Sequence, residues 1–196
     1  TFSIPEYGTT NIHYSLLPKR QGRNAMERAI MEGDETLGAT VFLMTRRVDA
    51  GPIVNQMSYE NPGDKSQGRL YNEHLEEYVD LTVRSVDKLA FAIDARKKAD
   101  GKKPALPVTP QIPSEMEYQE PLTEDDLFVD FAQMPAKTAR NYMNAGGPGA
   151  TTVIDGERYK ISKPSIIDDE AGVNDGITVK AADGKVLHIG KVEKIV

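Results

Sequence analysis

The sequence places an amide, an imidazole and a carboxylate where they could together carry out acyl or one-carbon transfer. Asn11 and His13 lie two residues apart in the string NIHYSLLP at residues 11–18, and Asp49 follows in VDAG at residues 48–51. An Asn side chain can stabilise an oxyanion, a His can move protons near neutral pH, and an Asp can orient that His. We therefore predict that Asn11, His13 and Asp49 form a catalytic trio.

Short strands and amphipathic helices are expected to position these residues. Residues 11–13 favour an extended piece, and apolar residues at helical spacing predict a helix over 23–32 that Gly33 ends. Compact apolar runs predict strands at 39–45 and 53–59, with Gly51-Pro52 between them. An apolar stripe predicts one long helix over 66–97, with His74 packed on its apolar face rather than catalytic.

A Pro-rich stretch divides the chain into two parts. The prolines in residues 104–121 are too dense for a helix or a central strand, so this stretch is expected to be an extended interdomain linker. Beyond it, a short helix is expected over 135–144. Asp155-Gly156 and Asp183-Gly184, each set between apolar runs, predict two hairpins. Residues 122–196 are therefore expected to form a small barrel or sandwich.

Composition excludes several kinds of protein. The 196 residues are 39% hydrophobic and 28% charged, with a formal net charge of −6 and no cysteine. Disulfides and Cys-based metal sites are thereby ruled out, and no cluster of metal-ligating residues is seen. The acidic balance gives no support for sequence-independent nucleic-acid binding, although a local basic patch remains compatible with RNA contact. No apolar run approaches the roughly 20 residues of a membrane helix.

The motif N-x-H-x-S-L-L-P, then a Gly, then D-x-G about one strand later, resembles the 10-formyltetrahydrofolate-dependent formyltransferase family. This sequence has each of those positions, including Gly22 and Gly51. The resemblance implies that Asn11, His13 and Asp49 are catalytic. It also implies that the formyl donor is the folate cofactor 10-formyltetrahydrofolate. The residues expected to bind this cofactor are Ser15, Leu16, Leu17, Pro18 and Gly51.

The resemblance also implies an α/β fold and a domain organisation. Residues 1–103 would be the C-terminal part of a Rossmann-like catalytic domain, and residues 122–196 a small OB-like β-barrel domain, as in the branch of the family that formylates methionyl-tRNA. The expected partners are the folate and an amine acceptor, with initiator tRNA as the leading case. A cytoplasmic location and no membrane partner are expected. Basic residues near the motifs are expected to contact the acceptor: Lys19, Arg20, Arg23 and Arg47.

Three other functions share the same residues. A sugar-nucleotide N-formyltransferase would use the trio on another amine, and a formyltetrahydrofolate hydrolase would use it with water. A non-catalytic binding module is the third, because the family's strands that precede the Asn-x-His motif are absent from this sequence, which opens at Thr1. We therefore expect the chain either to be part of a longer protein or to pair with a second copy.

Overall fold

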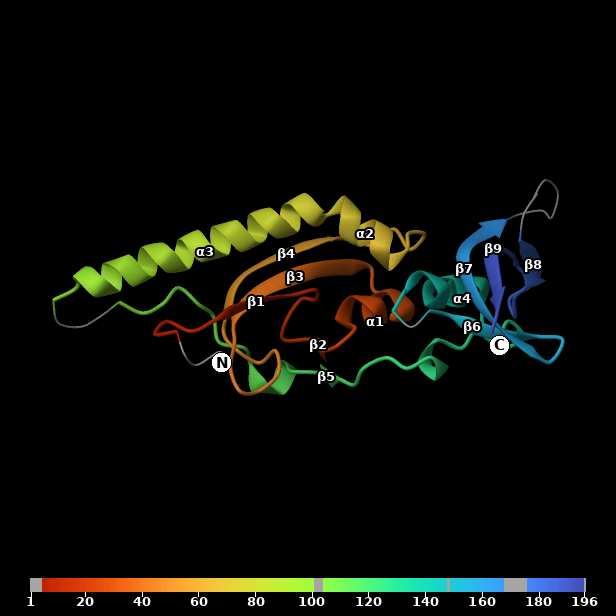
Figure 1. The fold of residues 1–196 in the computed structure, drawn as a ribbon, viewed down its shortest axis with the longest axis horizontal. Coiled ribbons are helices and arrows are strands. Elements are labelled where there is room, and N and C mark those ends of the chain that lie inside the picture. Colours follow the sequence, from red (N-terminus) through yellow and green to blue (C-terminus); the bar gives the residue numbers. More distant parts are fainter. Residues whose placement is uncertain (1–4, 101–103, 148, 168–175, 196) are drawn as a thin grey trace. The chain divides into compact units, whose positions relative to one another are not determined.

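A computed structural model of the chain describes residues 5–100, 104–147, 149–167 and 176–195. The chain forms two compact units, whose elements are labelled in Figure 1. The first unit comprises Thr1–Ala25, Thr36–Tyr59 and Glu73–Glu120, and the second comprises Met26–Glu35, Glu60–Asn72 and Pro121–Val196.

A three-stranded sheet forms the centre of the first unit. Its order is β1 (Thr10–His13), β3 (Thr36–Leu43), β4 (Ile53–Glu60). Strand β1 runs antiparallel to β3, and His13 lies opposite Thr40. The sequence explains the central place of β3, because its apolar run buries Leu37, Val41 and Phe42. A Rossmann-like sheet implies mainly parallel pairing; among the strand pairs described in this unit, only a short two-residue pair is parallel.

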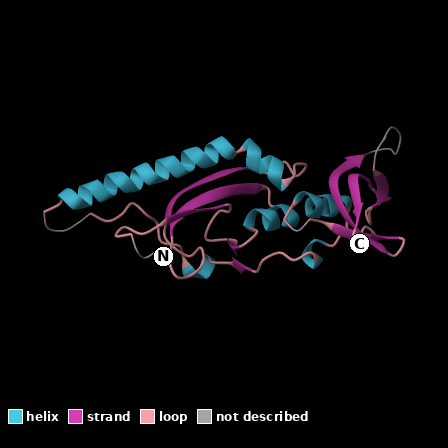
Figure 2. Cartoon of the chain, viewed as in Figure 1, coloured by secondary structure: helices cyan, strands magenta, loops and turns pink. Residues whose placement is uncertain are grey.

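The long helix α3 (Leu75–Lys98) contacts β3 and lies along this sheet, as Figure 2 shows. It buries Tyr78, Leu81 and Leu89 at helical spacing. The single helix expected over 66–97 is instead two helices, α2 (Gln67–Glu73) and α3, which are separated at His74. The imidazole of His74 stacks on the Tyr59 ring with centroids 3.7 Å apart. The interruption between α2 and α3 therefore lies at a tertiary contact that the spacing of apolar residues cannot predict.

Part of the Pro-rich stretch is built into the first unit. Strand β5 (Tyr118–Gln119) pairs in parallel with β2 (Gln21–Gly22), and the 3₁₀ helix η1 (Pro113–Glu115) precedes β5. Thr109 bridges Ile53 through two backbone hydrogen bonds of 2.7 Å each. The segment is extended, as its prolines require, and it also pairs with strands of the first unit, which a simple linker would not do.

The second unit contains a four-stranded antiparallel sheet. Its order is β6 (Thr151–Ile154), β7 (Glu157–Ile167), β9 (Val186–Lys194), β8 (Ile177–Lys180). Both expected hairpins are confirmed, and Asp155 and Gly156 have φ of 51° and 80°, as a type I′ turn requires. Helix α4 (Ala136–Asn144) packs on β7, and the short η2 (Asp125–Leu127) precedes it. Helices α1 (Ala25–Glu32) and α2 complete the described elements.

The core of the second unit lies between α4 and the sheet. Its fully buried side chains come from α4, from the strands and from the loops before them: Val129, Ala136, Ala139, Met143, Ala150, Ile161, Ala181, Leu187 and Ile189. The expected boundaries at 103/104 and 121/122 remain predictions, and residues 1–4, 101–103, Pro148, 168–175 and Val196 lie outside the described residues. Among the described helices, none has the length and apolar character needed to cross a bilayer.

Candidate active site

Strand β1 presents Asn11 and His13 on one face of the first unit's sheet. The two residues are separated by one position, so their side chains project to the same side of the strand. The Asn11 side chain is exposed, whereas the His13 side chain is only 10% exposed. An exposed amide beside a nearly buried imidazole is an arrangement in which a bound substrate could meet both groups.

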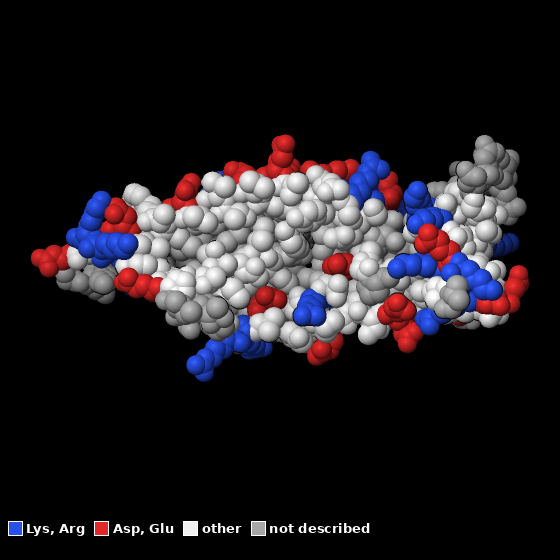
Figure 3. Space-filling view, viewed as in Figure 1, with Lys and Arg blue, Asp and Glu red and all other residues white. Residues whose placement is uncertain are grey.

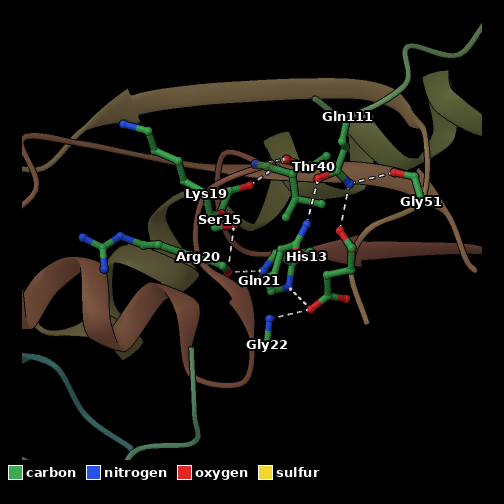
Figure 4. Close-up of polar contacts among 11 residues, drawn as sticks. His13, Ser15, Lys19, Arg20, Gln21, Gly22, Thr40, Gly51 and Gln111 are labelled. Atoms are coloured by element: carbon green, nitrogen blue, oxygen red, sulfur yellow. Dashed lines mark hydrogen bonds and ion pairs between the residues drawn. The ribbon is translucent and has the colours of Figure 1, made fainter. Parts of the chain in front are cut away.

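The His13 ring is held from two sides (Figure 4). Its Nε2 lies 2.8 Å from the carbonyl oxygen of Arg20, and because a carbonyl only accepts, Nε2–H is the donor. Its Nδ1 lies 3.6 Å from Oδ2 of Asp49, whose side chain is 13% exposed. Residues 36 positions apart in the sequence are thus brought together as the motif predicts.

The carboxylate of Asp49 is fixed by a second contact and by its backbone. The Gly22 amide donates to Asp49 Oδ2 at 2.9 Å, so one oxygen faces both that amide and His13. Asp49 has a φ of 47°, in the left-handed region that is unfavourable for a residue with a Cβ. This backbone conformation directs the side chain toward His13, so the surrounding structure has to hold it.

Two glycines allow the chain to pass close to its neighbours at this site. Gly22 has a φ of 103°, and a Cβ there would overlap the carbonyl oxygen of Gln119 on the paired strand. A Cβ on Gly51 would overlap the carbonyl oxygen of Leu43. Gly22 and Gly51 of the motif are therefore required by close backbone approach.

The loop at residues 15–18 is pinned by two side chains that the motif does not include. Thr40 Oγ1 donates to the Ser15 carbonyl at 2.6 Å and accepts from the Leu17 amide at 3.1 Å. Gln56 Nε2 donates to the Leu17 carbonyl and to Thr40 Oγ1, both at 2.8 Å. The peptide bond between Leu17 and Pro18 is cis.

Side-chain exposure divides the predicted folate-contacting residues. Ser15 and Leu17 are buried, at 5% and 3% exposure, and Ser15 Oγ donates to the Lys19 carbonyl at 3.0 Å. Leu16 and Pro18 are half-buried. Of the predicted loop, Leu16 and Pro18 therefore present partly exposed apolar surface, while Ser15 and Leu17 anchor the loop to the interior.

The predicted acceptor-contacting residues lie around the same loops. Lys19, Arg23 and Arg47 are exposed, and Arg20 is half-buried with its carbonyl on His13. Their positive charges lie close in sequence to the His13–Asp49 pair. Among the described residues, no group of three His, Asp or Glu side chains is arranged to hold a metal ion.

The sequence motifs do not include two buried glutamines that are linked by hydrogen bonds to the Asp49 backbone. Gln111 Nε2 donates to the carbonyls of Asp49 and Gly51, at 2.8 and 2.7 Å, and Gln21 Nε2 donates to Gln111 Oε1 at 3.0 Å. Gln111 and Gln21 are 7% and 1% exposed. A Gln inside a Pro-rich stretch carries no local signal of this contact, because its partners lie about 60 residues earlier.

Sequence comparison relates the chain to known proteins. Residues 2–86 match the family model described as formyl transferase. Methionyl-tRNA formyltransferase of Roseiflexus sp. strain RS-1 is 32% identical over 96% of this chain and 55% of its own length, and that of Thermobifida fusca strain YX is 32% identical over 88% and 52%. The chain thus spans about half the length of the curated relatives it matches.

Solved structures agree with the fold. HypX from Aquifex aeolicus, in complex with tetrahydrofolic acid, superposes with a TM-score of 0.71 at 20% identity, covering 96% of this chain and 32% of that chain. WlaRD, a sugar 3N-formyl transferase, superposes with a TM-score of 0.64 at 16% identity, covering 95% and 65%. Fold and matches together define an α/β protein of the formyltransferase type with an antiparallel sheet.

The chain is similar in sequence to the formyltransferase family. Its sequence similarity to methionyl-tRNA formyltransferases extends over most of its length, beyond residues 2–86, which the family model covers. The trio that the motif predicted lies within the matched segment.

Proposed function

We propose that this chain transfers a formyl group from 10-formyltetrahydrofolate to an amine, and that the amine is the amino group of methionyl-tRNA. The observation that carries the proposal is the contact of His13 with Asp49, beside Asn11, within the segment that matches the formyl transferase model. The names of the methionyl-tRNA formyltransferases that match most of the chain support this acceptor.

The chemistry assigns a task to each member of the trio. In the transfer, the amine nitrogen bonds to the formyl carbon, the bond from that carbon to the folate nitrogen breaks, and the proton lost by the amine balances the proton gained by the folate nitrogen. The exposed Asn11 amide donates to the formyl oxygen as negative charge develops there. His13 moves the proton, and Asp49 holds the ring in place and compensates its positive charge.

The residues present fit a folate donor. A pteridine needs an apolar slot with a few backbone polar groups. Leu16 and Pro18 supply half-buried apolar surface, and the contacts from Thr40 and Gln56 fix the backbone of that loop. The tetrahydrofolate complex of HypX, a protein with the same fold, supports a folate ligand.

The second unit is proposed to be a small OB-like barrel that contacts the tRNA. Its edge strands β6 and β8 both line one cavity of about 410 Å³, to which Thr152 and Val179 contribute, so the sheet curls toward closure. Lys and Arg side chains are intermixed with acidic ones over this unit in Figure 3. The basic residues of its strands are Arg158, Lys160, Lys163, Lys180, Lys191 and Lys194, and Lys185 lies in the turn between β8 and β9. A cytoplasmic location follows as a further proposal, because aminoacylated tRNA is found there.

An acceptor panel tests the proposal. The chain is incubated with 10-formyltetrahydrofolate and with methionyl-tRNA, an amino-sugar nucleotide, or no acceptor, and both tetrahydrofolate and formylated product are measured. We expect formyl-methionyl-tRNA to form. Formylation of the sugar nucleotide would favour the sugar-formylating activity for which WlaRD is named, and release of formate without acceptor would make the chain a hydrolase. Folate binding with no turnover in any arm would contradict the proposed function.

A further inference from the structure

Gln111 is a buried carboxamide whose hydrogen-bonding groups all meet one region of the first unit. It is 7% exposed and lies in the Pro-rich stretch, just after Thr109, which bridges Ile53. The backbone on both sides of Gln111 is anchored, because β5 pairs with β2 a few residues later. Gln111 is therefore positioned by an extended segment whose backbone is hydrogen-bonded on both sides of it.

The Gln111 side chain forms hydrogen bonds with the backbone of Asp49 and of Gly51. Its Nε2 has two hydrogens, and it donates to the carbonyl of Asp49 at 2.8 Å and to the carbonyl of Gly51 at 2.7 Å. Its Oε1 accepts from Gln21 at 3.0 Å. As Figure 4 shows, the Gln111 side chain lies beside Gly51 and donates to its carbonyl.

These bonds act on a part of the site whose backbone conformation is unfavourable. Asp49 has a φ of 47°, and in this conformation its carboxylate contacts His13 Nδ1 and the Gly22 amide. Fixing the carbonyls of Asp49 and Gly51 fixes the two peptide planes that determine where the Asp49 side chain points. Without the Gln111 donors, both carbonyls lose their partner and the turn gains freedom to relax.

We propose that Gln111 is a positioning residue that holds the Asp49 carboxylate against His13. The proposal rests on the proposed function for its effect on rate, but its structural part does not. Gln21 completes the arrangement, since it orients the Gln111 carboxamide so that its nitrogen faces the two carbonyls. Residues from the Pro-rich stretch, from β2 and from the Asp49 turn thus act together on a catalytic carboxylate.

The Gly22 amide reports the position of the Asp49 carboxylate, because it donates to Oδ2 at 2.9 Å. Proton–nitrogen NMR spectra of the chain and of Asp49→Ala define the Gly22 amide shift with and without this bond. We expect Gln111→Met, which keeps side-chain length but removes both donors, to move the Gly22 amide most of the way to its position in Asp49→Ala, with faster hydrogen exchange. Gln56→Met removes a comparable pair of bonds at the 15–18 loop and is expected to leave the Gly22 amide in place.

Kinetics separates positioning from a general loss of stability. In formyl transfer, Gln111→Met is expected to lower kcat about ten-fold or more with little change in the KM for the folate donor, since misplacement of a catalytic group by about 1 Å has effects of this size. In an Asp49→Asn background, Gln111→Met is expected to cause no further loss of kcat. Should Gln111→Met be poorly folded by circular dichroism, Gln111→Asn replaces it in both measurements.

Two results would overturn the proposal: a wild-type Gly22 amide shift in the Gln111 variant, or losses of kcat from Gln111→Met and Asp49→Asn that multiply in the double variant. Failure of the proposed function gives a different result. In that case Asp49→Asn leaves every formyl-transfer rate unchanged, while the Gly22 amide still reports whether Gln111 holds the carboxylate.

Discussion

At the scale of residues, the site depends on a few side chains that hold backbone groups in uncommon conformations. Asp49 and Gly22 both have positive φ, and one hydrogen bond joins them. His13 is placed between the Asp49 carboxylate and the Arg20 carbonyl. The arrangement of His13 and Asp49 is thus maintained by backbone packing as much as by the contact between their side chains.

Gly22→Ala tests that backbone requirement. A Cβ at this position both overlaps the Gln119 carbonyl oxygen and demands a left-handed conformation from alanine. We expect the free energy of unfolding to fall by about 1–3 kcal/mol, measured by urea denaturation. Gly68→Ala is the matched control: it lies in α2 with open space around it, so its stability should stay equal or rise by up to about 1 kcal/mol. Equal effects of the two substitutions would show that close packing at Gly22 is unimportant.

At the scale of elements, β4 and α3 are joined by a small aromatic cluster. The Tyr59 and Tyr78 hydroxyls lie 2.6 Å apart, and Tyr59 also stacks on His74. Burial raises the pKa of the Tyr59 hydroxyl above its ordinary value, and the hydrogen bond with Tyr78 partly opposes this. The Tyr59 hydroxyl therefore makes a contribution to stability that depends on pH.

The sign of that contribution is defined by linkage. Because the pKa of Tyr59 is higher in the folded state, the unfolded chain loses this proton first as the pH rises. Stability linked to Tyr59 is thus fully present below the unfolded pKa of about 10 and is lost as the pH rises from there through the folded pKa. Urea midpoints measured between about pH 8 and 11 should fall less steeply in Tyr59→Phe than in wild type. Parallel curves would contradict this account.

Local patterns predicted most elements but not their contacts. The runs at 39–45 and 53–59 correspond to β3 and β4, and the Asp-Gly turns correspond to the two hairpins, because these signals are local. The break at His74 and the contacts of Gln111 depend on partners far away in sequence. The motif predicts the trio, whereas Thr40 and Gln56, which pin the neighbouring loop, lie in strands with no distinguishing pattern.

At the scale of the whole molecule, a negative net charge coexists with basic side chains on the strands of the second unit. The chain has a formal net charge of −6, yet basic side chains recur along the β7–β9 region of the second unit. Some of them are paired with acidic groups, for example Lys191 with Glu193 and Lys194 with Glu157. Contact with tRNA would therefore depend on particular lysines and not on the net charge.

Lys163→Ala tests this proposal for the second unit. Lys163 is exposed on β7, and loss of one phosphate contact is expected to weaken methionyl-tRNA binding and to reduce the slope of log K against log salt by about 1. Lys98→Ala serves as the control, because Lys98 ends α3 and pairs with Asp94 at 2.6 Å. An unchanged salt slope in Lys163→Ala, Lys160→Ala and Lys180→Ala would exclude this face from the tRNA contact.

The most direct test of formyl chemistry at His13 is the rate of formyl transfer from labelled 10-formyltetrahydrofolate to methionyl-tRNA by His13→Ala. His188→Ala, a histidine on β9 outside the site, is the matched control. We predict that His13→Ala lowers kcat by about 10²-fold or more, as loss of a general acid–base group does, while His188→Ala retains the wild-type rate. Full turnover by His13→Ala would contradict the account.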